Sequence, residues 1–186
     1  MRAYIAVDVS SDSLAKVQNE ILSSTTAAGW SLKDVKPVEP HNFHFTLIFL
    51  GEIKEYEINR IIEKLSGIQF EPFTIVYTGI GGFPSAAHAR VVWVGVDSEG
   101  TQRLTALAND VVSKMSDLGF KPDKPFSAHL TLLRSRGRPV KASYFSSNYH
   151  GITFGSDRIE KMHLKKSELT KSGPMYSNVY TVEAKK

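Results

Sequence analysis

The pattern of apolar and polar residues divides the chain into short strands and amphipathic helices. Apolar residues at alternate positions or in compact runs predict strands at residues 3–9, 32–38, 43–51, 73–80, 91–96, 126–134, 151–154, 158–165 and 175–182. Apolar residues three and four positions apart predict helices at residues 11–27, 54–65 and 102–118. We expect Ser10 to cap the first helix, and Gly29, Gly67 and Gly119 to follow the three helix ends.

The order of these elements indicates the fold class. Strands and helices are mixed in the first two thirds of the chain, and the remainder is rich in strands, which predicts an α+β fold with helices packed on antiparallel sheets. Residues 135–147, rich in Arg, Lys, Gly and Ser, are expected to form a loop. The glycines at 79–82 predict a hairpin turn or bulge, since no P-loop signature follows them. No boundary between autonomous domains is visible, so we expect one domain spanning residues 1–186.

Two of the predicted strands carry the same unusual pair of polar residues. His44 and Thr46 lie in FHFTLIFLG at 43–51, and His129 and Thr131 lie in FSAHLTLLR at 126–134. Alternate residues of a strand share one face, so each His lies beside its Thr. A polar pair in an apolar strand is unfavourable unless it meets water or a ligand. One strand histidine alone is usually structural, but two copies of one arrangement predict a shared site.

The residue types in these pairs indicate acid–base chemistry. Two histidines can hold opposite protonation states near neutral pH, so that one deprotonates water and the other protonates a leaving alkoxide. Threonine hydroxyls on the same faces can donate to phosphate oxygens. With an arginine nearby, such residues would hold a phosphodiester between the imidazoles without a metal or other cofactor.

The composition and charge of the chain exclude only a few classes of function. The net charge of +4 and the pI of about 9.2 weakly favour an anionic partner. The absence of cysteine excludes disulfides, thiolate nucleophiles and cysteine-bound zinc. The apolar run at the N-terminus is broken by Asp8 and is typical of a strand, and no stretch approaches the roughly 18 apolar residues needed to span a membrane. We therefore expect a cytoplasmic protein with no membrane partner.

The two motifs, with their surroundings, resemble a known family. HFTLIFLG at 44–51 and HLTLLR at 129–134 resemble the paired H-x-T-x motifs of the two-histidine (2H) phosphoesterases. RAYIAVDVS, FLGEI, GIGGFP, ARVVWVGV, LGF and KKSELTKSGPMY resemble segments of one branch, the archaeal and bacterial RNA 2',3'-cyclic phosphodiesterases, often labelled 2'-5' RNA ligases. The resemblance covers nearly the whole chain.

The resemblance implies a fold and a reaction. The fold would be a bilobal α+β structure, with two antiparallel sheets, outer helices and internal pseudo-two-fold symmetry around a central cleft. The reaction would open a 2',3'-cyclic phosphate at an RNA end to a 2'-phosphate, without metal. His44 would be the proton donor, His129 the proton acceptor, and Thr46, Thr131 and Arg134 would bind the phosphate.

Arg134 needs a departure from ideal strand geometry. It follows His129 by an odd number of residues, which places it on the opposite face of a regular strand. It can reach the phosphate only if the strand ends, twists or bulges near Leu133. The other reading is an exposed arginine in a solvated basic loop.

Other residues are candidates for RNA contacts beyond the phosphate. Basic side chains of the loop could bind further phosphates, and aromatic rings could stack on a terminal base. The basic candidates are Arg136, Arg138 and Lys141. The aromatic ones are Tyr176 and Phe83, whereas Phe45 and Phe49 are expected to pack in the core, opposite the His-Thr face.

Several rival functions stay open at this point. The same acid and base would catalyse the reverse reaction, 2'-5' ligation of RNA ends, and a small cyclic nucleotide could replace an RNA end such as that of a tRNA half as substrate. From another class, the chain could bind RNA ends without turnover. A metal site built on His41 and His44 lacks a carboxylate at ligand spacing. A monomer is expected.

Overall fold

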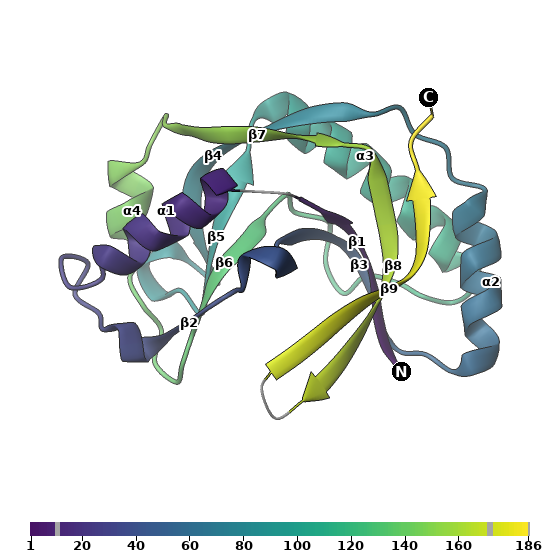
Figure 1. Ribbon diagram of the computed structural model, residues 1–186, viewed down its shortest axis with the longest axis horizontal. Coiled ribbons are helices and arrows are strands. Elements are labelled where there is room, and N and C mark those ends of the chain that lie inside the picture. Colours follow the sequence, from purple (N-terminus) through teal and green to yellow (C-terminus); the bar gives the residue numbers. More distant parts are fainter. Residues whose placement is uncertain (10–11, 171–172, 186) are drawn as a thin grey trace.

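The computed structural model describes residues 1–9, 12–170 and 173–185, which form two antiparallel sheets with helices outside them (Figure 1). The four-stranded sheet has the order β3-β1-β8-β9, with strands β3 (His44–Glu52), β1 (Arg2–Asp8), β8 (Lys161–Thr170) and β9 (Gly173–Glu183). The five-stranded sheet has the order β2-β6-β5-β4-β7, with strands β2 (Val35–Pro37), β6 (Leu130–Ser135), β5 (Val91–Val96), β4 (Phe73–Phe83) and β7 (Thr153–Ile159).

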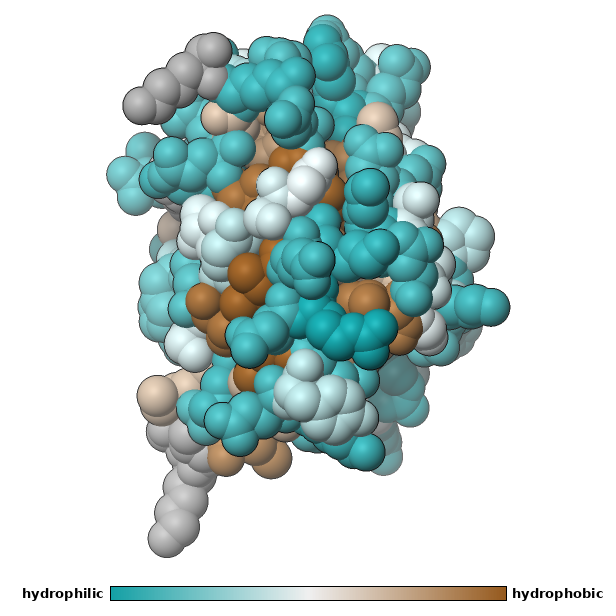
Figure 2. All heavy atoms as spheres, turned by 90° about the vertical axis from the view of Figure 1, so that its right-hand side faces the viewer, coloured by the Kyte–Doolittle hydropathy of each residue, from teal (hydrophilic) through white to brown (hydrophobic). Residues whose placement is uncertain are grey.

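Four α-helices lie on the outer sides of the sheets. They are α1 (Asp12–Ser23), α2 (Glu55–Ser66), α3 (Ser98–Ser116) and α4 (Ser143–Asn148), and short 3-10 helices span Leu32–Asp34, Pro40–Asn42 and Ala86–His88. Figure 1 shows α1 and α4 beside the five-stranded sheet and α2 at the opposite side of the molecule. The face formed by α2 is mainly hydrophilic, with apolar side chains visible between the polar ones (Figure 2). None of the helices in the described ranges is long and apolar enough to cross a membrane.

The chain order repeats a strand–helix–strand unit around the two motifs. β1, α1 and β3 form the first unit, and β3 pairs antiparallel with β1. β5, α3 and β6 form the second, and β6 pairs antiparallel with β5. Each motif strand therefore pairs with the strand that opens its unit, although β2 lies between α1 and β3 in the chain and flanks β6 in the other sheet. The predicted α+β class with two antiparallel sheets and internal pseudo-two-fold symmetry is confirmed.

The predicted strand positions are largely correct, but several predicted boundaries are wrong. The first helix ends at Ser23 rather than at residue 27, because Ser and Thr side chains there bond to the backbone and compete with the helix. Ser23 Oγ donates to Asn19 O at 2.8 Å, and Thr25 Oγ1 donates to Leu22 O at 3.2 Å. The N-cap predicted at Ser10 lies outside the described residues.

Four further segments differ from the prediction. Residues 32–34 form a 3-10 turn before the short β2, because Ser31 and Asp34 make a capping box. Residues 135–147, expected to form a loop, include most of α4, whose Phe145 side chain is buried in the core. The glycine run makes no hairpin turn, since β4 continues to Phe83 with a register shift at Gly79, so only the predicted bulge is correct. The helix α3 begins at Ser98, about one turn before the predicted start at residue 102.

Candidate active site

The two motif histidines are held in the same way. His44 is the first residue of β3, and His129 immediately precedes β6. Nδ1 of His44 lies 2.6 Å from the carbonyl oxygen of Asn42, and Nδ1 of His129 lies 2.8 Å from that of Ser127. A carbonyl oxygen only accepts, so Nδ1 carries the proton and donates in both rings. Nε2 is therefore the atom of each ring that can accept or donate a proton to a substrate.

A β-bulge follows the threonine in both motif strands. The pairing of β3 with β1 slips between Thr46 and Ile48, and that of β6 with β5 slips between Thr131 and Leu133. Two consecutive apolar residues are buried at each slip, since one strand position is inserted there. They are Leu47 and Ile48 in β3, and Leu132 and Leu133 in β6. The alternation of faces reverses at this point in both halves.

The bulge changes which residue comes next on the His-Thr face. Arg134 is exposed and follows two fully buried leucines, so it lies on the face of Thr131. The sequence allowed Arg134 to reach the phosphate only if the strand ends, twists or bulges near Leu133, and this bulge meets that condition. Phe49 occupies the corresponding position of β3 and is 66 % exposed. The prediction that Phe49 packs in the core is therefore wrong, whereas the same prediction for Phe45, which is fully buried, is correct.

The positive charge of Arg134 acts on both histidines. Burial is the main cause that lowers the pKa of His44, and Arg134 lowers it further. Burial also lowers the pKa of His129, with Arg134 again adding to the effect. One guanidinium therefore lies close enough to both imidazoles to influence their protonation. A guanidinium that acts on both rings can supply the counter-charge for an anion bound by them.

A charged pair that the sequence analysis missed stands beside His44. Asp8 is the register partner of His44 on β1, and its carboxylate raises the pKa of that ring. Lys165 on β8 is buried, and its Nζ donates to both carboxylate oxygens of Asp8 at 2.7 and 2.6 Å. His163 Nε2 lies 3.7 Å from the same carboxylate. The only sequence signal for this cluster is the charge of Asp8 at the end of an apolar strand.

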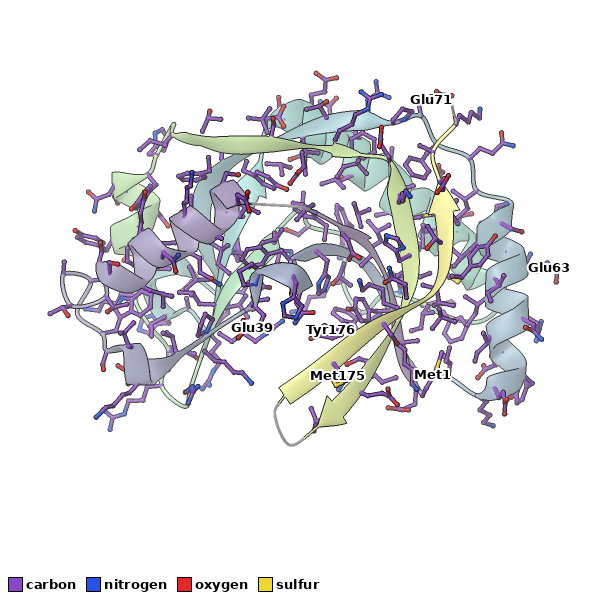
Figure 3. All side chains as sticks on the ribbon, viewed as in Figure 1. Met1, Glu39, Glu63, Glu71, Met175 and Tyr176 are labelled. Atoms are coloured by element: carbon purple, nitrogen blue, oxygen red, sulfur yellow. The ribbon has the colours of Figure 1, made fainter. Side chains whose placement is uncertain are left out.

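Aromatic rings flank each histidine. The ring of His44 lies 5.1 Å from that of Tyr4 and 5.8 Å from that of Tyr176, measured between centroids. Tyr176 belongs to the β8–β9 hairpin, which projects beyond the rest of its sheet (Figure 3). The ring of His129 lies 4.8 Å from Phe83 and 6.4 Å from Trp93. Tyr176 and Phe83, both predicted as stacking candidates, are thus placed beside a motif histidine.

Two of these rings carry buried hydrogen-bond donors. The hydroxyl of Tyr4 and the Nε1–H of Trp93 have no hydrogen-bond partner among the described residues. Burial is the main cause that raises the pKa of Tyr4, so this hydroxyl keeps its proton at neutral pH. An unpaired buried donor costs about 1–3 kcal/mol. Both donors lie on rings that contact a motif histidine, one in each half.

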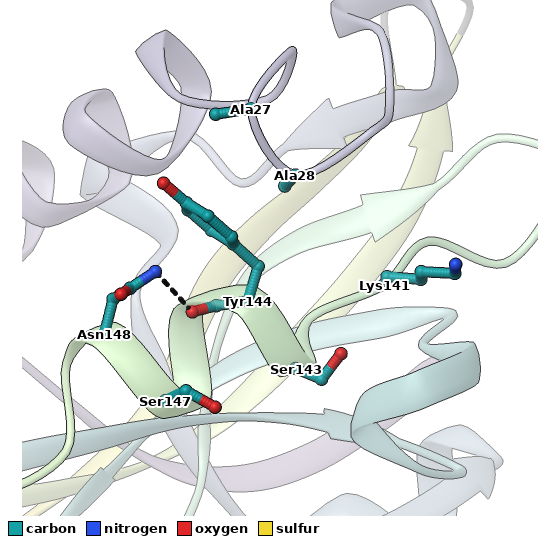
Figure 4. Close-up of a pocket in the computed structure, with 7 residues that line it drawn as sticks. All are labelled: Ala27, Ala28, Lys141, Ser143, Tyr144, Ser147 and Asn148. Atoms are coloured by element: carbon teal, nitrogen blue, oxygen red, sulfur yellow. Dashed lines mark hydrogen bonds between the residues drawn. The ribbon is translucent and has the colours of Figure 1, made fainter.

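The rest of the basic loop is tied to another part of the molecule. The backbone N–H of Arg136 donates to the carbonyl oxygen of Asp34. Arg138 lines a cavity of about 310 Å³, which contains no residue of the two motifs. A neighbouring cavity of about 470 Å³ lies between α4 and the turn after α1, where Tyr144 and Lys141 line it (Figure 4). RNA contacts by Arg136 and Arg138 stay predictions, and neither cavity overlaps the histidine site.

Comparisons with known proteins agree with this architecture. The sequence model of the family described as LigT-like phosphoesterase matches the chain twice, over residues 8–93 and 94–176. A protein of Escherichia coli, LigT, solved in complex with 3'-AMP, superposes with a TM-score of 0.75 at 23 % identity, covering 100 % of this chain and 98 % of that one. A structure from Thermus thermophilus superposes with a TM-score of 0.70 at 27 % identity, covering 98 % and 97 %.

Sequence relatives cover the whole length of the chain. A protein of Archaeoglobus fulgidus named RNA 2',3'-cyclic phosphodiesterase is 41 % identical over 183 residues, covering 98 % of this chain and 100 % of the relative. A protein of Methanothermobacter thermautotrophicus with the same name is 33 % identical over 188 residues, covering 96 % of each. The chain belongs to the LigT-like phosphoesterase family, and the predicted 2H relationship and the predicted phosphoesterase class are confirmed. Each family match contains one of the two motifs.

Cofactor and metal chemistry are not tested by these findings. Within the described ranges, no group of three or more His, Asp or Glu side chains could hold a metal ion. His41, the second ligand of the rival metal site, lies in the 3-10 helix Pro40–Asn42 that precedes β3. Independence from metal therefore stays a prediction.

Proposed function

We propose that the protein hydrolyses 2',3'-cyclic phosphate ends of RNA to 2'-phosphates, with His44 and His129 as the acid and base and without a metal. The observation that carries the proposal is the matched pair of imidazoles, each anchored through Nδ1 and each offering Nε2. The substrate class is supported by the Archaeoglobus and Methanothermobacter relatives, which bear the name RNA 2',3'-cyclic phosphodiesterase.

The residues have defined roles in this reaction. Nε2 of His129 takes a proton from water as the water oxygen bonds to phosphorus. The bond from phosphorus to O3' breaks, and Nε2–H of His44 gives its proton to the departing oxygen. The hydroxyls of Thr46 and Thr131 donate to non-bridging oxygens, and Arg134 neutralises their charge. The product carries a 2'-phosphate and a 3'-hydroxyl, and proton exchange with water restores both rings.

The assignment of acid and base is supported by the charges around the rings. Both rings have a lowered pKa because of burial, but the carboxylate of Asp8 acts in the opposite direction on His44. For His129, Arg134 is the charged side chain that acts, and it favours the neutral ring. A neutral imidazole is the form needed by a base, and a protonated one the form needed by an acid. The carboxylate of Asp8 thus supports His44 as donor, against the opposing charges of Lys165 and Arg134, and the guanidinium of Arg134 supports His129 as acceptor.

Hydrolysis is preferred over ligation on entropic grounds. Water is present at about 55 M, whereas a second RNA end must be bound and oriented beside the first. Each half of the chain supplies one histidine, so we propose that residues 1–186 act as one domain and that one chain is sufficient for activity.

The test is the turnover of a 2',3'-cyclic phosphate, as a mononucleotide and at an RNA end, in the presence of EDTA. His44→Ala and His129→Ala are each expected to lower kcat by about 10²- to 10⁴-fold while end-binding persists. His150→Ala is the matched control, because His150 is exposed and lies in the turn before β7, so it should leave kcat unchanged. Full activity of either motif variant would overturn the mechanism, and loss of wild-type activity in EDTA would revive the metal site. Binding without turnover would favour the end-binding module.

A further inference from the structure

The pair of Asp8 and Lys165 is built into the sheet on the side of the histidine site. In β1, Ala3, Ile5 and Val7 belong to the buried core, so Asp8 lies on the opposite face. In β8, Met162 and Leu164 belong to the core, which places Lys165 on that same opposite face. The ammonium of Lys165 meets both carboxylate oxygens, and the side chains of Lys165 and Asp8 are 10 % and 35 % exposed.

The burial of Lys165 in this ion pair calls for a physical explanation. Removing two charges from water is unfavourable, and well-packed apolar residues of similar size are often as stable or more stable in such positions. Stability alone therefore does not explain why a lysine lies in the interior of β8. The neighbour with a chemical use for charge is His44, which stands opposite Asp8 in the pairing of β1 with β3.

Charged and titratable groups face His44 from four strands. Asp8 and Tyr4 come from β1, Lys165 from β8, Tyr176 from β9 and Arg134 from β6. His163 of β8 stands behind Asp8 and bonds through Nδ1 to Thr181 Oγ1 at 2.9 Å. Among these groups, Asp8 is the anion, and Lys165 and Arg134 are the cations whose charges act on the ring of His44.

The register position opposite His129 differs from the one that Asp8 occupies opposite His44. The pairing of β5 with β6 joins Val94 to Leu130, so continuing the antiparallel register by one residue brings Gly95 opposite His129. The position of Asp8 in the first half is thus taken by a residue without a side chain. The carboxylate is a difference between two otherwise equivalent histidine environments.

We propose that Asp8 and Lys165 act together as positioning residues that set the protonation of His44, with Asp8 favouring the imidazolium and Lys165 limiting that effect. This rests on the proposed function, in which His44 is the acid. An uncompensated carboxylate would stabilise the imidazolium further and so make it a weaker acid toward O3'. The lysine donates to both oxygens of Asp8, which weakens the effect of the carboxylate on the imidazole of His44. The imidazolium can therefore still give its proton to O3'.

The two partners must therefore shift the pKa of His44 in opposite directions. Asp8→Asn keeps the size of the side chain but removes the anion, which is expected to lower the pKa of His44 by about 0.5 to 1 pH unit. Lys165→Met keeps the apolar stem but frees the carboxylate, which is expected to raise that pKa by a similar amount. The double variant carries neither charge, so its His44 is expected to titrate close to the wild-type value.

The experiment is an NMR titration of the imidazole Cε1–H signals, with His44 and His129 assigned from their alanine variants. Lys161→Met is the matched control, because Lys161 lies on the same strand in an exposed ion pair with Glu183 at 3.0 Å and should move neither pKa. The pKa of His129 should stay unchanged in all four variants. In the pH profile of kcat/KM, the inflection that reports the titration of His44 should shift by the same amount as the pKa of His44 measured by NMR.

Two kinds of outcome separate this proposal from the proposed function. Shifts of His44 in the same direction in both single variants, or equal shifts of His44 and His129, would overturn the charge-pair role. If a single variant does not fold, the double variant, which leaves no charge unpaired, still tests the proposal: a pKa of His44 far from wild type would contradict it. Opposite shifts without any catalytic defect in His44→Ala would preserve the charge pair and overturn the acid role instead.

Discussion

The strongest packing prediction concerns Gly81, which lies under the indole of Trp93. A Cβ at position 81 would overlap the ring, lying 2.7 Å from its Cε2 atom, where carbon atoms normally stay about 3.5 Å or more apart. Two further ring atoms, Cζ2 and Cη2, would lie closer still to this Cβ, so in Gly81→Ala the indole must move by more than about 1 Å. Trp93 lies beside His129 and shares the contact with Phe83, so the displacement reaches the catalytic ring.

The expected effects of Gly81→Ala are on both stability and rate. Overpacking of this kind costs about 1–3 kcal/mol, which lowers Tm by about 3–10 °C in a chain of this size. A misplacement of the base by about 1 Å is expected to lower kcat/KM by about 10²-fold. Thermal unfolding and turnover of a 2',3'-cyclic mononucleotide measure the two effects.

Gly67→Ala is the matched control for this substitution. A Cβ at Gly67 would meet only Lys64 O, at an ordinary 3.6 Å, so Tm and kcat/KM should be kept. Wild-type Tm and turnover in Gly81→Ala would refute the packing of Trp93 on Gly81. A lowered Tm with full turnover would show that the indole does not position His129.

Three further substitutions test individual groups of the site and the fold. Arg134→Lys keeps the charge but loses the planar guanidinium, and a fall in kcat of about 10-fold or more is expected. Arg60→Lys, at an exposed position of α2, is the control that should leave kcat unchanged. Tyr4→Phe removes an unpaired buried hydroxyl, so thermal unfolding should show a Tm equal to or above wild type. Burial raises the pKa of Asp157, whose carboxylate accepts from Tyr77 Oη at 2.6 Å. A carboxyl whose pKa is higher in the folded state stabilises the fold at low pH, and this stabilisation is lost as the pH rises through the folded-state pKa. Asn carries no charge at either pH, so Asp157→Asn should raise Tm at pH 7 more than at pH 4. A lower Tm in Tyr4→Phe, or a Tm gain independent of pH in Asp157→Asn, would contradict these assignments.

The alternation of residues predicted the motif strands but not the residues beyond their bulges. A rule of period two correctly placed His44 beside Thr46 and His129 beside Thr131. It failed at Phe49, because an inserted residue in the strand pairing reverses the faces. Such an insertion depends on the partner strand and leaves no local pattern in the sequence. For Arg134, periodicity predicted the opposite face, and only the family resemblance argued that the strand bulges before it.

Long-range pairing and short elements explain the remaining differences. Asp8 and Lys165 lie at opposite ends of the chain, and only the pairing of β1 with β8 brings them together. The sequence alone predicts that a lysine near a hairpin is exposed, so it gave no indication that Lys165 is buried. The helix α4 has six residues and a single buried one, Phe145, which is too few for a helical period to be recognised.

The central claim is that a histidine pair opens the cyclic phosphate toward the 2'-phosphate with water as the nucleophile. The most direct measurement is the position of the phosphate, and of the oxygen isotope, after hydrolysis of a 2',3'-cyclic RNA end in ¹⁸O-labelled water with EDTA. We expect a 2'-phosphate carrying one ¹⁸O atom, formed by the wild-type protein and lost in His44→Ala and in His129→Ala. A 3'-phosphate, an unlabelled phosphate or unchanged product from either variant would contradict the claim.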